Sequence, residues 1–155
     1  MQRIFPPEFT LAGNGNSRPG DQAYSLNSGA YRLIVALSRP ACITPGCLGR
    51  LRLAPGRYCY LGSARRGLHQ RVARHLRVAS GQSCGGHWHI DALLMHRHAR
   101  VVAVDLVPQG DECELSLTLA AAPGTSVPIA GFGATDCRCG CPAHLYRLSS
   151  DIASP

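Results

Sequence analysis

Residues 56–76 read GRYCYLGSARRGLHQRVARHL, which indicates a short aromatic strand that ends at a glycine and is followed by a basic helix. The expected helix runs from about 66 to 79, and one of its sides is apolar. The apolar stripe comprises Leu68, Val72, Leu76 and Ala79. Arg71 and His75 lie four residues apart on the side of this stripe, so both are expected to face the core. Because charged groups are rarely buried without a partner or a function, Arg71 is a candidate site residue.

The opposite, solvent-facing side of this helix carries three arginines, Arg66, Arg74 and Arg77. All sixteen basic residues of the chain are arginines, and the formal net charge is +7. A basic surface attracts polyanions, and the guanidinium group binds phosphate through two hydrogen bonds. We therefore expect DNA to be the partner, and these three arginines to contact its backbone without reading bases.

A second strand is predicted over residues 30–38, where apolar side chains alternate with the period of a strand. Tyr31 lies near the start of this strand, and Tyr60 lies near the end of the strand before the basic helix. Two tyrosines on paired strands that face a half-buried arginine make a site suited to phosphate chemistry. Tyrosine is also an ordinary core residue of strands, so a purely structural role for each stays open.

The remaining pattern predicts a small α+β domain, with a mainly antiparallel sheet flanked by helices. The further expected elements are strands at 48–53, 57–62 and 100–107, a short helix that ends at Met95, a helix at 112–122 and an irregular segment at 131–148. We expect one domain over 29–148, with a loose tail at 1–28 and another at 149–155.

The chain of 155 residues has no apolar run that approaches the roughly 18 residues of a membrane span. Its first residues lack the apolar core of a secretory signal. We therefore expect a cytoplasmic protein that does not contact membranes. In that compartment the eight cysteines are expected to be thiols or metal ligands rather than disulfides.

Few acidic residues are available for chemistry. Asp111 and Glu114 have the spacing of a helix capping box. Glu112 shares the helix face that should meet the sheet, where a carboxylate needs a cation. That cation is either Arg71, in a buried ion pair, or a divalent metal such as Mg²⁺.

A cluster of soft ligands lies near the C-terminus, at Cys137, Cys139, Cys141 and His144. Zinc prefers four such ligands in a tetrahedron, so a zinc site is possible here, and Cys113 can replace one of the four. Reduced, partly buried cysteines and a redox function are the alternatives. A separate motif, His87-Trp88-His89-Ile90-Asp91, is either part of a metal site or the entrance of a helix.

Several segments together resemble the GIY-YIG nuclease superfamily, and in particular its Uri-type, or DUF123, branch. The segments that carry the resemblance are Gly29-Ala30-Tyr31, Tyr60-Leu61-Gly62, Arg71 with His75, His87 to Asp91, Glu112 to Leu115 and Phe132 to Cys139. The resemblance implies a compact sheet flanked by helices and a DNA endonuclease that depends on Mg²⁺ or Mn²⁺. It also implies a place in DNA repair or processing, beside a DNA-repair enzyme as a possible partner.

The resemblance also implies roles for single residues. Tyr31 helps to deprotonate the attacking water, Tyr60 positions or assists, and Arg71 stabilises the phosphate charge, with His75 one helical turn further on. The family's metal-binding glutamate lies deeper in its helix, so Glu112 takes this role here because of its helix face. The rival interpretation is a non-catalytic nucleic-acid-binding or zinc-stabilised module on the same scaffold.

Overall fold

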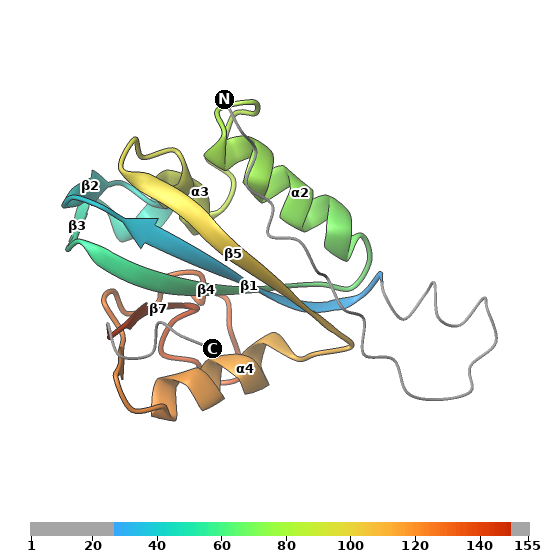
Figure 1. The fold of residues 1–155 in the computed structure, drawn as a ribbon. Coiled ribbons are helices and arrows are strands. Elements are labelled where there is room, and N and C mark those ends of the chain that lie inside the picture. The colour runs from blue at the N-terminus through green and yellow to red at the C-terminus, as the bar shows by residue number, and fades with distance from the viewer. Residues whose placement is uncertain (1–26, 150–155) are drawn as a thin grey trace.

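The structure is a computed structural model that describes residues 27–149 (Figure 1). The predicted tails at 1–28 and 149–155 lie outside the described residues, apart from Asn27, Ser28 and Ser149. The described chain is an α+β fold in which three α-helices flank an antiparallel sheet, as the sequence predicted.

The main sheet has five strands in the order β5-β1-β4-β7-β6. Their bounds are Gly29–Leu37 for β1, Gly56–Ala64 for β4, Ala99–Pro108 for β5, Thr125–Ser126 for β6 and Leu145–Leu148 for β7. Every neighbouring pair is antiparallel. β7 lies within the segment that we expected to be irregular, because its four residues are too few to show an alternating pattern.

The segment between β1 and β4 forms a separate hairpin. Its strands are β2 (Ala41–Ile43) and β3 (Leu51–Leu53), joined through a 3-10 helix at Gly46–Leu48. The strand predicted at 48–53 is therefore shorter than expected.

Three helices complete the fold, α2 (Leu68–Ala79), α3 (His89–Leu94) and α4 (Glu112–Ala121). Asn27 accepts hydrogen bonds from two backbone amides at the start of α2. Its side-chain Oδ1 accepts from the amide of Gly67, and its backbone carbonyl accepts from the amide of Leu68. Asp111 caps α4 through a 2.8 Å bond from the amide of Glu114, as predicted. Among the described residues, no helix has the length and apolar character that crossing a membrane requires.

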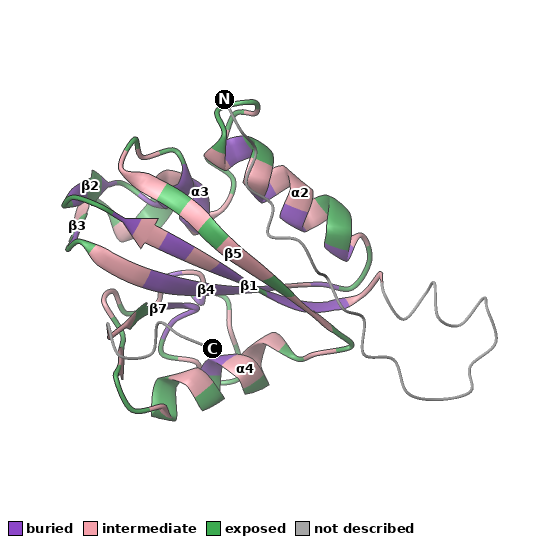
Figure 2. Cartoon of the chain, in the orientation of Figure 1, coloured by how far each residue is buried: buried purple, intermediate pink, exposed green. Residues whose placement is uncertain are grey.

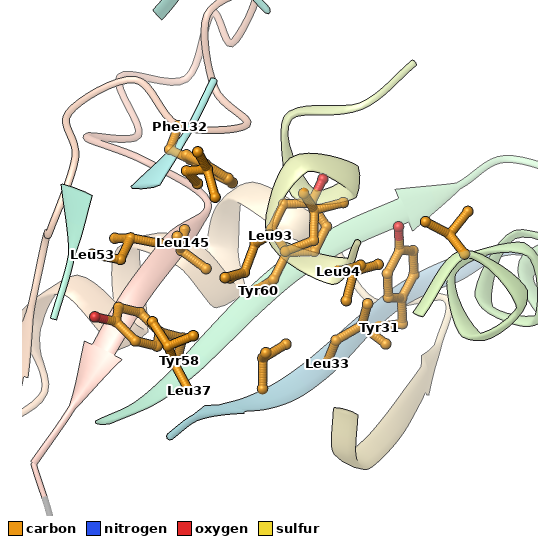
Figure 3. Close-up of a cluster of buried hydrophobic side chains, with 14 of the residues drawn as sticks. Tyr31, Leu33, Leu37, Leu53, Tyr58, Tyr60, Leu93, Leu94, Phe132 and Leu145 are labelled. Atoms are coloured by element: carbon orange, nitrogen blue, oxygen red, sulfur yellow. The ribbon is translucent and has the colours of Figure 1, made fainter. Parts of the chain in front are cut away.

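The two faces of the sheet carry separate clusters of buried side chains. Tyr31, Leu33, Val35 and Leu37 alternate along β1 and are buried against residues of α2 and α3. Figure 3 shows Tyr31 and Tyr60 of this cluster on the neighbouring strands β1 and β4.

The opposite face packs against α4, which Figure 1 shows on the other side of the sheet from α2. This smaller cluster joins Cys59, Leu61 and Tyr146 to Leu115 and Leu119 of α4. The central strands β1 and β4 are thus covered on both sides and are largely buried (Figure 2).

The buried side of α2 carries the residues that the helical pattern placed there. His75 is fully buried and Arg71 is half-buried. Arg74 is a correction, because it was predicted on the solvent-facing side and is instead half-buried in an ion pair with Asp91 of α3. Arg77, one turn later, is exposed as expected. The expected first helical turn at 66 is also wrong, because Arg66 precedes the helix.

Candidate functional site

A cleft of about 650 Å³ lies at the end of β4. Four of the five residues predicted to be catalytic line it, namely Tyr31, Tyr60, Arg71 and Glu112. The fifth, His75, is not a lining residue and lies behind Tyr31. The structure thus brings together side chains from β1, β4, α2 and α4 that are far apart in the sequence.

Gly62 allows the tyrosine of β1 to reach this cleft. Tyr31 is paired with Gly62 in the register of β1 and β4. A Cβ atom added at Gly62 would overlap the Tyr31 ring at its hydroxyl end. The glycine of the predicted motif is therefore required by the close approach of a side chain from the neighbouring strand.

The Tyr31 hydroxyl lies 2.8 Å from Nε2 of His75, and the two side chains are almost completely buried. Burial raises the pKa of Tyr31 above its usual value, although the Arg71 charge opposes this. Burial also lowers the pKa of His75 to about 4, with help from the Arg74 and Arg71 charges and against the effect of Asp91. At neutral pH the pair is therefore an uncharged phenol beside an uncharged imidazole.

Asp91 is a buried carboxylate that joins α2 to the start of α3 next to the cleft. Arg74 donates to both of its oxygens, at 3.0 and 2.8 Å, and the amides of Gly86, His87 and Trp88 donate to its Oδ2. Burial alone would raise the pKa of Asp91, but the bonds from Arg74 and from the Trp88 amide outweigh it and lower that pKa. The carboxylate is thus charged, and it fixes the entrance to α3.

The motif around Asp91 forms the entrance of α3, where Asp91 accepts from the amides of residues 86–88. His89 and His87 both line the cleft. Nδ1 of His89 accepts from the amide of Gly133, and the ring of His87 packs edge-on against Trp88. The histidines thus serve as packing and hydrogen-bonding groups in the cleft wall.

Arg71 is held in a fixed position on one wall. Its Nη1 donates to the carbonyl of Ser63 at 2.7 Å, and its guanidinium carbon lies 4.7 Å from the centre of the Trp88 ring. The alternative of an Arg71–Glu112 ion pair is wrong, because no such pair occurs among the described residues.

Glu112, at the start of α4, contacts two other groups of the cleft. Its Oε2 accepts from the Ser63 hydroxyl at 2.5 Å, and its Oε1 lies 3.0 Å from Nδ1 of His144. Burial would lower the pKa of His144, but the bond and charge of Glu112 outweigh burial and raise that pKa. The side chain of Glu112 keeps 23% of its surface exposed, so it remains accessible from the cleft.

A group of four potential metal ligands adjoins the same cleft. One ligand atom from each of Cys113, Cys137, Cys141 and His144 lies within 4.8 Å of the others. The predicted ligand Cys139 is exposed and outside this group, and Cys113 of α4 takes its place. Three cysteines and a histidine at this spacing can hold a metal ion such as Zn²⁺.

The three arginines predicted to bind the DNA backbone differ in their exposure to solvent. Arg66 and Arg77 are exposed, whereas Arg74 is engaged by Asp91. Sequence reasoning missed two charged residues of the cleft lining, Asp136 and Arg138, although both lie in a segment that carried the family resemblance. Their place in an irregular loop gives no periodic signal of orientation.

The chain matches the family model described as "Domain of unknown function DUF123" over residues 30–154. No curated protein and no solved structure matches significantly. The matched range contains every residue that lines the cleft, and it extends over most of the chain. The chain therefore belongs to the DUF123 family.

Proposed function

We propose that this protein is a metal-dependent endonuclease of the GIY-YIG type that hydrolyses DNA phosphodiester bonds. The observation that carries the proposal is the meeting of Tyr31, Tyr60 and Arg71 on one cleft that also contains the carboxylate of Glu112. Phosphodiester hydrolysis needs a proton acceptor for water, positive charge at the phosphate and a group that orients the reactants. The cleft contains a candidate for each.

Arg71 is the group that binds the scissile phosphate. Its planar guanidinium matches two phosphate oxygens, and the contacts with Ser63 and Trp88 hold it before the substrate arrives. Arg138, which also lines the cleft, adds positive charge on the wall formed by the loop. A preformed cationic site stabilises the charge that develops on the phosphate without further reorganisation.

Tyr31 accepts the proton of the attacking water. The water transfers a proton to the Tyr31 oxygen while Tyr31 passes its own hydroxyl proton to Nε2 of His75, 2.8 Å away. The resulting imidazolium faces Asp91, whose Oδ1 lies 3.6 Å from Nδ1 of His75. His75 is thus a positioning residue that acts through Tyr31, and Tyr60, beside it, orients the bound phosphate.

Mg²⁺ or Mn²⁺ would supply positive charge next to the phosphate. Glu112, with Asp136 on the same lining, offers the oxygen ligands that such ions prefer, and these ions commonly use one or two carboxylates together with substrate phosphates. Ser63 and His144 hold the Glu112 carboxylate in place. The residues therefore fit the ion, although Glu112 lies earlier in its helix than the family's glutamate.

DNA binds through charge rather than through base contacts. The net charge of +7 and the exposed Arg66 and Arg77 favour contacts with the phosphate backbone. We therefore expect little sequence specificity from the isolated protein. A partner enzyme of DNA repair would supply the choice of site.

Nicking of supercoiled plasmid tests the proposal. The protein should convert plasmid to the open circular form with added Mg²⁺ or Mn²⁺, and Arg71→Ala should abolish this conversion. Arg52→Ala, an exposed arginine on β3, is the matched control and should retain full activity. Circular dichroism and thermal melting establish that both variants fold. Nicking that survives in Arg71→Ala would contradict the assignment.

The Cys113, Cys137, Cys141 and His144 group favours a second candidate, a zinc-stabilised module that binds nucleic acid without cutting it. This module should shift DNA in a gel with or without Mg²⁺ and produce no nicked plasmid with either metal ion. The same preparation therefore distinguishes the two functions.

A further inference from the structure

The first turn of α4 and the loop before β7 place three thiols around one point. The Sγ atoms of Cys113 and Cys137 are 3.7 Å apart. A tetrahedral zinc ion with Zn–S bonds of about 2.3 Å requires its sulfurs to be about 3.8 Å apart. A disulfide requires about 2.05 Å between its sulfurs, and all the described cysteines are free. The spacing thus suits two thiolates that share a metal.

His144 supplies a second, independent observation. Its side chain is 6% exposed, and its Nε2 has no hydrogen-bond partner among the described residues. Buried polar atoms without partners are rare in folded proteins, because the lost hydrogen bonds to water are not replaced. Since Nδ1 already faces Glu112 at 3.0 Å, Nε2 is the ring nitrogen that is left for a metal.

We propose that Cys113, Cys137, Cys141 and His144 bind one structural zinc ion, and that Glu112 orients the ligand histidine from the cleft side. Histidine ligands of zinc usually donate their other ring N–H to a carboxylate, which fixes the ring and increases its basicity. Thiolate and imidazole ligands select zinc over the hard ions Mg²⁺ and Ca²⁺. Four protein ligands fill the tetrahedron, so this zinc has no open position for catalysis.

The proposed ion would shape the cleft. The chain from 127 to 144 contains no regular helix or strand, and it carries the lining residues Asp136 and Arg138. Zinc joins this loop to the start of α4, whose Glu112 also lines the cleft. One wall therefore depends on the metal for its shape. The zinc proposal goes beyond the nuclease proposal, and it stands or fails independently of DNA cleavage.

Metal content of the full chain tests the proposal directly. Protein purified without an affinity metal or chelator should contain one zinc per chain by plasma mass spectrometry. Cys137→Ser should lose most of this zinc, whereas Cys139→Ser, an exposed cysteine two residues away, should retain it. A metal-free wild type, iron with inorganic sulfide, or a Cys113–Cys137 disulfide found by mass spectrometry would each overturn the assignment.

Two further measurements remain informative if Cys137→Ser fails to fold. Replacement of zinc by Co²⁺ in the wild type should give the intense visible bands and thiolate charge-transfer absorption of a tetrahedral thiolate site. Weak bands of octahedral Co²⁺ would exclude the proposed ligand set. Glu112→Gln should still bind one zinc, with an affinity lower by roughly 10–100-fold in competition with a chromogenic chelator. An unchanged affinity would remove Glu112 from the site.

Discussion

The hydroxyl of Tyr31 and Nε2 of His75 lie 2.8 Å apart in the interior, between β1 and α2. Only Tyr31 of this pair lines the cleft. The helical pattern predicted His75 to be a residue of the site, and in the structure Tyr31 lies between His75 and the cleft. The pair connects the cleft to the buried carboxylate of Asp91, 3.6 Å beyond His75.

Removal of the Tyr31 hydroxyl should lower the nicking rate much more than it lowers the stability of the fold. Under the proposed mechanism, Tyr31→Phe removes the proton acceptor, and the nicking rate should fall by about 10²–10⁴-fold. Tyr58→Phe is the matched control, because Tyr58 is also buried on the sheet and its hydroxyl donates to the carbonyl of Ala54. Each variant should lose about 1 kcal/mol of unfolding free energy. Equal nicking rates in the two variants would exclude Tyr31 from the chemistry.

The buried imidazole of His75 predicts a pH dependence of stability. Its pKa in the folded protein is about 4, below the ordinary value of 6.5, so the unfolded chain binds a proton first as the pH falls. His75 therefore makes its full contribution to the free energy of unfolding above pH 6.5. As the pH falls from 6.5 to 4, this contribution of about 3 kcal/mol is lost. NMR titration of the histidine ring carbons measures this pKa directly. A midpoint near 6.5 for His75 would show that the ring is charged at mildly acidic pH.

Arg74→Ala and Arg77→Ala should differ strongly in their effect on the free energy of unfolding. Arg74→Ala leaves the buried Asp91 without its bidentate partner and should lower the free energy of unfolding by about 3 kcal/mol. Arg77→Ala changes an exposed residue and should alter stability by less than about 0.5 kcal/mol. Urea unfolding measures both values. If Arg77→Ala weakens DNA binding, it should do so without this loss of stability.

The periodicity of α2 predicted which side of this helix faces the sheet, but it could not predict the contacts made by the other side. Arg74 forms an ion pair with Asp91 because α3 packs beside α2. The pattern of one helix contains no information about a second helix that begins ten residues after it ends. In the sequence Asp91 belongs to a motif that fits a metal site or a helix start, whereas in the structure it is fully buried and accepts from the amides of residues 86–88.

The metal-ligand group shows a similar limit of sequence reasoning. Proximity in the chain favoured Cys139 as a ligand, yet the structure selects Cys113, which lies more than twenty residues earlier. The loop turns at Gly140, whose φ is 77°, and Cys139 is exposed to solvent. The strand and helix patterns, by contrast, predicted Tyr31, Tyr60 and Arg71 correctly as neighbours, because regular elements fix the direction of each side chain.

Gly62→Ala should damage the cleft by displacing a tyrosine from the next strand. The new methyl group would overlap the hydroxyl end of Tyr31, so the ring must move away from His75 or the strands must separate. We expect a loss of about 1–3 kcal/mol in unfolding free energy, as overpacking of a core causes. The nicking rate should fall as well, because the Tyr31–His75 hydrogen bond is broken. Gly81→Ala is the control, since its φ of 73° is unfavourable for alanine but its Cβ meets no atom within 4 Å. If Gly62→Ala costs no more stability than Gly81→Ala and retains activity, the close approach of Tyr31 does not shape the cleft.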